Sequence, residues 1–179
     1  PARTSSGHEA GTILDLPCGT GRFTGHLARE GYDIVGSDIA MEMMQVAAEQ
    51  LRGTPHLRGY VRADAERLPL RDGAVDCVIS IRFLLHIDPV TRVSIVREMA
   101  RVSTRWLILD YRHKHSYRYK MLRLRRALGV PSARKLPQVA RAEMTSELAA
   151  AEVRVTKIFP VARFFSDKWV VLCEKTVSS

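Results

Sequence analysis

The chain has few cysteines, no long apolar run and one long stretch without acidic residues. Its three cysteines, Cys18, Cys77 and Cys173, lie far apart, which suits reduced thiols better than a disulfide framework or a zinc site. No apolar run is long enough to span a membrane, and no charged and then apolar leader opens the chain. These absences predict a cytoplasmic protein. Because only about ten residues precede the first predicted strand, we also expect that an N-terminal segment is missing.

The stretch without acidic residues runs from Asp110 to Glu143. Residues 112–135 carry nine of the 28 lysines and arginines, and the remaining basic residues equal the 19 acidic ones in number. The net charge of +9 is therefore a local property of this segment. With 179 residues and 46% hydrophobic content, the chain can bury one core, so we predict a single domain, 1–179, with a basic helical insertion at about 112–135.

The segment 11–24 predicts a strand, a glycine turn and a helix. A short apolar run, 12–16, is typical of a buried parallel strand, and a helical pattern follows at 22–30. Gly19 and Gly21 lie between them. Glycines in such a turn let a ligand approach the backbone and the exposed N–H groups of the next helix. This stretch is therefore the first candidate for a binding site.

Strands and helices alternate along the rest of the chain. Further strands are predicted to end at Asp38 and to span 60–63, 76–81 and 106–111, with helices at 41–51, 90–102 and 143–152. Alternation of this kind predicts an α/β fold with a parallel sheet covered on both faces. Two last strand-like runs, 153–165 and 168–175, are so close that they predict an antiparallel hairpin.

Acidic residues follow three of these strands. Asp15 ends the first, Asp38 the second and Asp64 follows the third, so all three are expected around one crevice. An acidic side chain in the position of Asp38 can accept hydrogen bonds from both ribose hydroxyls, in dinucleotide-binding folds and in others. A dinucleotide fingerprint would require glycine at the position of Thr24. The pattern therefore disfavours NAD.

In the glycine turn and the three acidic residues at the strand ends, the chain resembles the class I S-adenosylmethionine-dependent methyltransferases, in particular the small-molecule type 11 group. The resemblance is detailed from residue 12 to 111 and extends in outline through the hairpin. It implies a Rossmann-like, doubly wound, seven-stranded and mostly parallel sheet in the order 3-2-1-4-5-7-6, with strand 7 antiparallel and helices on both faces. It also implies S-adenosyl-L-methionine as the cofactor. The family's first turn glycine is replaced by Pro17, which can hold the bend but has no N–H to donate.

The resemblance assigns a set of cofactor-binding residues at the ends of the strands. They are Asp15, Pro17, Gly19, Thr20 and Gly21 on the methionine side, Asp38 at the ribose, Ile39, Met43, Asp64 and Ala65 at the adenosine, and Ile81 near the reactive methyl. Leu68 is a further candidate wall for the adenosine. A methionine on a helix is equally typical of ordinary core, so both interpretations of Met43 stay open.

The catalytic residues are less well defined. His86 matches the second histidine of the family's Leu-His-His-Ile/Leu-Pro segment, where it could act as a base; a structural histidine bonded to nearby backbone is the alternative. Arg82, Tyr111 and His113 are expected to line the substrate pocket. No metal is expected, because His113 and His115 lack a third ligand at a suitable spacing.

The sequence thus predicts methyl transfer to a small-molecule or lipid-like acceptor by in-line displacement. An RNA methyltransferase that uses segment 112–135, and a cofactor-binding module without activity, are the alternatives. The Asp/Asn-Pro-Pro-Tyr tetrapeptide of nucleic-acid amine methyltransferases is absent, since residues 80–83 read Ser-Ile-Arg-Phe. A basic amphipathic helix at 116–128 has three conceivable uses, which are a lid over the acceptor, contact with an anionic membrane surface and contact with RNA, favoured in that order.

Overall fold

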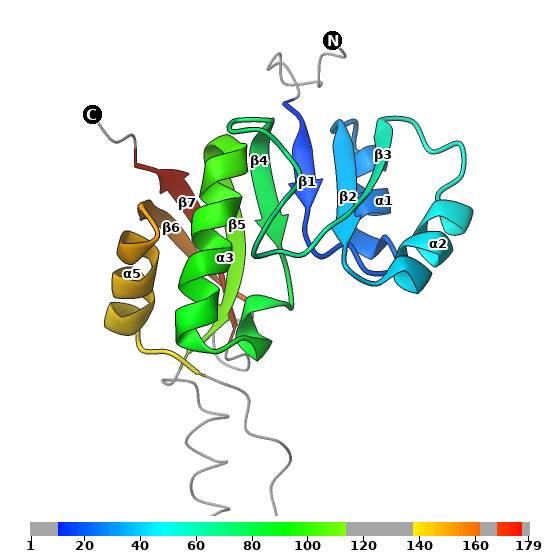
Figure 1. The fold of residues 1–179 in the computed structure, drawn as a ribbon. Coiled ribbons are helices and arrows are strands. Elements are labelled where there is room, and N and C mark those ends of the chain that lie inside the picture. The colour runs from blue at the N-terminus through cyan, green and yellow to red at the C-terminus, as the bar shows by residue number, and fades with distance from the viewer. Residues whose placement is uncertain (1–10, 114–137, 162–167, 177–179) are drawn as a thin grey trace, which may run out of the picture.

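A computed structural model describes residues 11–113, 138–161 and 168–176, and the strands in it form one seven-stranded sheet (Figure 1). The strands are β1 (Ile13–Asp15), β2 (Ile34–Asp38), β3 (Leu57–Arg62), β4 (Val75–Ser80), β5 (Ser103–Arg112), β6 (Val153–Pro160) and β7 (Lys168–Lys175). Their order is β3-β2-β1-β4-β5-β7-β6, and β7 alone runs antiparallel to its neighbours. The predicted fold class, strand order and hairpin are confirmed.

Helices lie on both faces of this sheet. They are α1 (Arg22–Arg29), α2 (Met41–Gln50), α3 (Pro89–Val102), α5 (Arg141–Ala150) and the 3-10 helix η1 (Leu84–His86). In Figure 1, α3 and α5 lie in front of the sheet and α1 lies behind it. Asp88 caps the N-terminus of α3, because its carboxylate accepts hydrogen bonds from the N–H groups of Val90 and Thr91 at 3.0 and 3.1 Å. The basic helix predicted at 116–128 lies outside the described residues.

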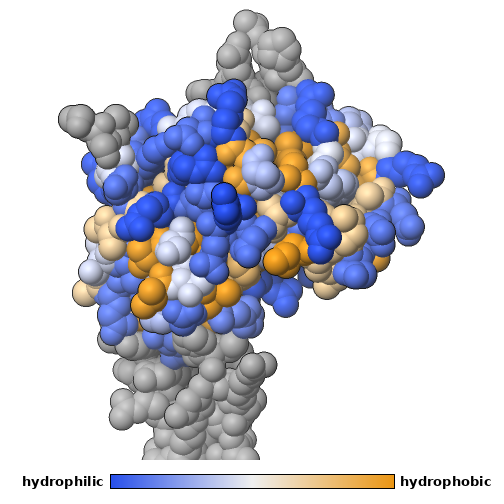
Figure 2. Space-filling model, in the orientation of Figure 1, coloured by the Kyte–Doolittle hydropathy of each residue, from blue (hydrophilic) through white to orange (hydrophobic). Residues whose placement is uncertain are grey.

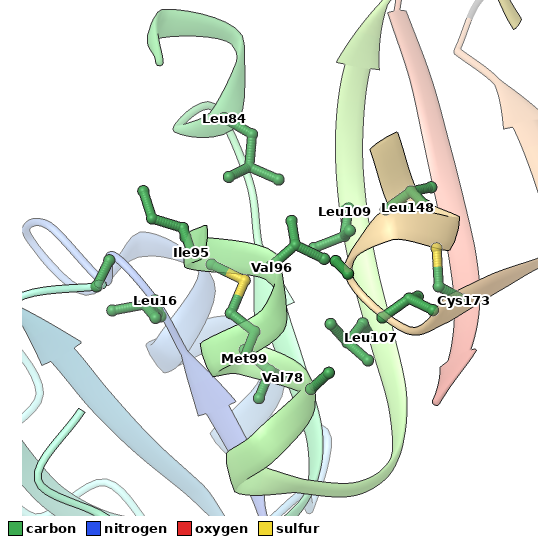
Figure 3. Close-up of a cluster of buried hydrophobic side chains, with 14 of the residues drawn as sticks. Leu16, Val78, Leu84, Ile95, Val96, Met99, Leu107, Leu109, Leu148 and Cys173 are labelled. Atoms are coloured by element: carbon green, nitrogen blue, oxygen red, sulfur yellow. The ribbon is translucent and has the colours of Figure 1, made fainter. Parts of the chain in front are cut away.

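The largest part of the core lies between the sheet and the two front helices. Figure 3 shows side chains of α3 and α5 meeting those of β5 and β7, among them Met99, Leu109, Leu148 and Cys173. Each of these four side chains is fully buried, and the burial of one such leucine stabilises the fold by about 1.5–3 kcal/mol. This packing fixes where β4, β5 and β7 end, and therefore where the residues that follow them lie.

The third strand differs from its prediction, because it begins at Leu57 instead of Tyr60. Gly59 has a φ of 134°, and the pairing with β2 shifts register near Ile34 and Val35. Glycine contributes no side chain to the apolar pattern of a strand. The apolar pattern that predicts this strand is therefore visible in the sequence only after Gly59.

The two faces of the sheet differ in their covering. The face with α3 and α5 is largely hydrophilic on its outside, with smaller apolar patches (Figure 2). On the opposite face, a groove of about 760 Å³ is lined by apolar side chains that include Ile13, Ile79, Trp106, Ile108 and Leu172. We call it the rear groove. Among the described residues, no helix is long and apolar enough to cross a membrane.

The turn before α1 requires glycine at position 21. Gly21 has a φ of 79°, and a Cβ there would lie 2.8 Å from Leu51 Cδ1 and 2.9 Å from Ala47 Cβ. We expect Gly21→Ala to lower the free energy of unfolding by about 1–3 kcal/mol, through backbone strain and crowding together. Urea denaturation measures the loss. Gly31→Ala is the control, because Gly31 also has a positive φ, 91°, but faces open space; equal losses in the two variants would contradict the crowding.

Candidate functional site

The candidate site lies along the edge of the sheet where the parallel strands end, which we call the carboxyl edge. Asp15 and Asp38 are the last residues of β1 and β2. Gly19, in the turn after β1, donates its N–H to Asp38 Oδ2 at 2.9 Å, and Ala40 donates its N–H to Oδ1 at 3.0 Å. Asp38 is 7% exposed. The glycine turn and the predicted ribose acceptor are therefore directly connected.

Asp15 lies deeper in this edge, with 2% exposure. The Thr24 hydroxyl, from α1, donates a hydrogen bond to Asp15 Oδ2 at 2.6 Å. Burial raises the pKa of Asp15 to about 6, although the Thr24 hydrogen bonds oppose that rise. Thr24 is the residue at which the dinucleotide fingerprint fails, and the sequence analysis assigned it no role. A buried carboxylate of this kind favours a cationic ligand group, such as the ammonium group in the methionine part of S-adenosyl-L-methionine.

Cofactor affinity should depend on pH through Asp15. An ammonium group binds the ionised carboxylate, so binding lowers the pKa of Asp15 and releases a proton. With a pKa of about 6 in the free protein, affinity rises as pH increases to that value and is level above it. At about pH 5, S-adenosylhomocysteine should bind about tenfold more weakly than at about pH 7.5. Calorimetric titrations at both pH values measure the change.

Asp15→Asn is the control for this titration, because the amide keeps the size of the side chain and loses its ionisation. Its affinity should be lower at about pH 7.5 and should no longer rise between about pH 5 and pH 7. An unchanged rise in this variant would assign the pH dependence to another group.

Apolar side chains are exposed beside Asp38, where the adenosine is predicted. Ile39 is 59% exposed and Met43 is 47% exposed, so Met43 is not a core residue. Large exposed apolar side chains suit contact with a flat apolar ligand. Leu68, in contrast, is 4% exposed and belongs to the core.

The other predicted cofactor residues lie in the turns after β1 and β3. Pro17 is partly buried and Thr20 is exposed in the glycine turn. After β3, Asp64 is exposed and accepts the N–H of Glu66 at 3.0 Å, while Ala65 is buried. The Asp64 carboxylate therefore holds a local turn and is also exposed to solvent.

The turn after β4 is held by a carboxylate from the neighbouring strand. Arg82 has a φ of 65°, which is uncommon for a residue other than glycine. Its N–H is donated to Asp110 Oδ1 at 2.8 Å, and Asp110 is 3% exposed on β5. Burial raises the pKa of Asp110. Asp110 thus fixes the backbone at Ile81 and Arg82, where the reactive methyl is predicted.

His86 lies at the end of η1 with an exposed side chain. Its backbone N–H is donated to the Phe83 carbonyl at 2.9 Å, but its ring has no hydrogen-bond partner within the described part of the chain. The alternative in which nearby backbone holds the ring is not observed. Among the described residues, the His86 side chain is therefore exposed and makes no hydrogen bond through its ring.

Tyr111 and His113 are placed differently from Arg82. Tyr111 is 1% exposed and faces α3, with the Arg92 guanidinium carbon 5.7 Å from its ring centre, and burial raises its pKa. Because side chains alternate along β5, the Tyr111 side chain lies in the core on the side of α3, opposite to the side that Asp110 faces. The His113 ring stacks on Trp169, with centres 4.5 Å apart. His115 lies outside the described residues, which contain no cluster of potential metal ligands.

Comparison with known proteins places these residues in a family. A family model described as "Methyltransferase domain" matches residues 14–105. A demethylmenaquinone methyltransferase of Beutenbergia cavernae is 38% identical over 91 residues, which are 51% of this chain and 35% of that protein. A ubiquinone/menaquinone biosynthesis C-methyltransferase of Pectobacterium atrosepticum is 36% identical over 107 residues, 55% of this chain and 42% of that protein. The chain thus matches less than half the length of either relative.

Solved structures show the same fold. A methyltransferase structure from Methanosarcina mazei has a TM-score of 0.74 at 22% identity and covers 96% of this chain and 95% of its own. Magnesium protoporphyrin IX methyltransferase from Synechocystis PCC 6803, solved with bound SAH, has a TM-score of 0.75 at 19% identity. The similarity covers 93% of this chain and 74% of that chain. Both similarities cover more than nine tenths of this chain and therefore extend past residue 105.

Proposed function

Because the chain belongs to the methyltransferase domain family, we propose that it binds S-adenosyl-L-methionine and transfers its methyl group to a small-molecule or lipid-like acceptor. The observation that carries this proposal is the carboxyl edge, where the buried Asp15 lies beside a glycine turn that is hydrogen-bonded to Asp38. The relatives named for quinone methylation support a small acceptor. The structural neighbour with bound SAH supports the cofactor.

The residues of the edge have separate roles in this proposal. Asp15 binds the ammonium group and Asp38 the ribose hydroxyls, while Ile39 and Met43 contact the adenine. When bound, the cofactor supplies a methyl group on an activated sulfonium leaving group. The chain therefore has mainly to align the acceptor with that methyl and to exclude water. His86 accepts the proton of an acceptor that arrives protonated.

The alternative of RNA methylation depends on segment 112–135. Within that segment the structure describes only Arg112 and His113, so it adds no observation in favour of RNA. The small-acceptor proposal depends on the described edge instead.

The direct test is a methyl-transfer screen with the full chain, methyl-labelled cofactor and fractionated cell extract. We expect label in a small-molecule or lipid fraction, and none in nucleic acid. Nuclease treatment of the labelled product is the control. Label that becomes acid-soluble only after nuclease treatment would replace the proposal with RNA methylation, and cofactor binding without transfer in any fraction would favour a module without activity.

A further inference from the structure

Two residues of α3, Glu98 and Arg101, hold the segment that connects β3 to β4. Arg101 donates hydrogen bonds from all five N–H groups of its guanidinium. Two of them are accepted by the Glu98 carboxylate, at 2.8 and 2.7 Å. The other three are accepted by the carbonyls of Leu68 and Leu70, at 3.1 and 2.9 Å, and by the Asp72 carboxylate, at 2.6 Å. We call Glu98 and Arg101 the Glu98–Arg101 pair.

Leu68 is the residue that this pair holds most completely. Its N–H is donated to Glu98 Oε1 at 2.8 Å, and its C=O accepts a hydrogen bond from Arg101 at 3.1 Å. The Leu68 side chain is 4% exposed and belongs to the core. Hydrogen bonds to charged groups are about twice as strong as neutral ones. The backbone at Leu68 is therefore fixed on both of its polar groups.

A short turn joins Leu68 to two of the predicted cofactor residues. Arg67 donates its N–H to the Asp64 carbonyl at 3.0 Å, and the Asp64 carboxylate accepts the N–H of Glu66 at 3.0 Å. This turn ends directly before Leu68. Ala65, within it, is 8% exposed and belongs to the core, whereas Asp64 is exposed. The direction of the Asp64 carboxylate therefore depends on where the Glu98–Arg101 pair places Leu68.

Connections between strands are usually the least firmly held parts of a fold. The connection from β3 to β4 differs, because one arginine binds two of its backbone carbonyls and one of its carboxylates. The hydrogen bonds from Arg101 also hold the pKa of Glu98 below its ordinary value, so the pair stays ionised at neutral pH. Residues that bind a ligand through a fixed geometry need such support from their neighbours.

We propose that the Glu98–Arg101 pair positions Asp64 for the adenine of the cofactor, and thereby makes the chain prefer adenine to a purine without the exocyclic amino group. This inference rests on the proposed function, because it takes Asp64 as the acceptor for that amino group. A carboxylate accepts a hydrogen bond from the amino group of adenine, but it has no proton to donate to the carbonyl oxygen of hypoxanthine. Glu98 and Arg101 act through Asp64, so they are positioning residues.

The test compares S-adenosylhomocysteine with S-inosylhomocysteine, which differ only at the edge of the base that carries the exocyclic group. Calorimetric titration of the full chain with each ligand gives the ratio of their dissociation constants, which we call the adenine preference. We expect an adenine preference of about tenfold or more in the wild-type chain, and of less than about threefold in Arg101→Gln. Partial unfolding of the variant would weaken both ligands by the same factor and leave this ratio unchanged.

Arg97→Gln is the matched control on the same helix. Arg97 also donates to a backbone carbonyl, that of Ala150 at the end of α5, at 2.7 Å. Its replacement removes the same charge from α3 and should leave the adenine preference at the wild-type value. An equal loss of preference in both variants would overturn the inference. Arg101→Gln with a wild-type adenine preference would also overturn it, because the pair would then stabilise the fold without positioning Asp64.

Two further variants test whether the pair acts through Asp64. Asp64→Ala should also lower the adenine preference below about threefold, and its combination with Arg101→Gln should lower it no further, because both changes remove one interaction. A further loss in the double variant would overturn the inference. Glu98→Gln keeps the size of the side chain and an oxygen for the Leu68 N–H, but loses the charge that Arg101 meets. It should lower the preference about threefold, and an unchanged preference would contradict the role of the pair.

The two ligands separate a failure of the proposed function from a failure of this inference. If the wild-type chain does not bind S-adenosylhomocysteine, the proposed function fails and the inference fails with it. If the wild-type chain binds both ligands equally well, only the inference fails, because methyl transfer does not require recognition of the exocyclic amino group.

Discussion

Replacing His86 by alanine should lower turnover about 100-fold or more and leave the affinity for S-adenosylhomocysteine nearly unchanged. The reason is that the exposed His86 ring has no hydrogen-bond partner within the described residues, so its removal costs the fold little and removes the candidate base. Turnover is measured with the acceptor that the methyl-transfer screen identifies, and affinity by calorimetry.

His26→Ala is the matched control for this variant, because His26 is also an exposed histidine at the end of a short helix, α1. It should keep wild-type turnover. A His86→Ala protein with normal turnover would exclude His86 as the base. If it also melted at a lower temperature, His86 would have a structural role.

Asp38→Ala should weaken the binding of S-adenosylhomocysteine by about 10- to 100-fold, which corresponds to about 1.5–3 kcal/mol for hydrogen bonds to a charged group. The variant removes the predicted ribose acceptor and also releases the N–H groups of Gly19 and Ala40. Calorimetric titration measures the change in affinity.

Asp33→Ala is the control at the other end of the same strand. Asp33 directly precedes β2 and accepts hydrogen bonds from His56 and Arg58, so its loss changes the same charge away from the carboxyl edge. Cofactor affinity in this variant should remain at the wild-type value. Wild-type affinity in Asp38→Ala would remove Asp38 from the ribose site.

The α/β class, the terminal hairpin and the strand ends could be predicted because they depend on apolar patterns, whereas the strand order was implied by the resemblance to the family. Asp15 and Asp38 end their strands as predicted, and alternating elements allow few other arrangements. The hydrogen bond from Thr24 to Asp15 could not be predicted in the same way. It depends on how the glycine turn directs the first turn of α1 back toward the strand, which is a property of backbone geometry.

The residues expected around the methyl acceptor were harder to predict, because their positions also depend on backbone geometry. Tyr111 was expected in the substrate pocket from its place at the end of β5, but the alternation along that strand turns it toward α3. The register of β5 with β7, which places Tyr111 opposite Trp169, is a second property that the sequence did not reveal. Register cannot be derived from the apolar pattern of two short strands to within one residue.

The identity of the cofactor is measured by two calorimetric titrations of the full chain, one with S-adenosylhomocysteine and one with NAD. We expect saturable binding of S-adenosylhomocysteine and no binding of NAD, because Thr24, whose hydroxyl donates a hydrogen bond to Asp15, occupies the position at which dinucleotide-binding turns have glycine. Saturable binding of NAD, or no binding of S-adenosylhomocysteine by the folded chain, would contradict it.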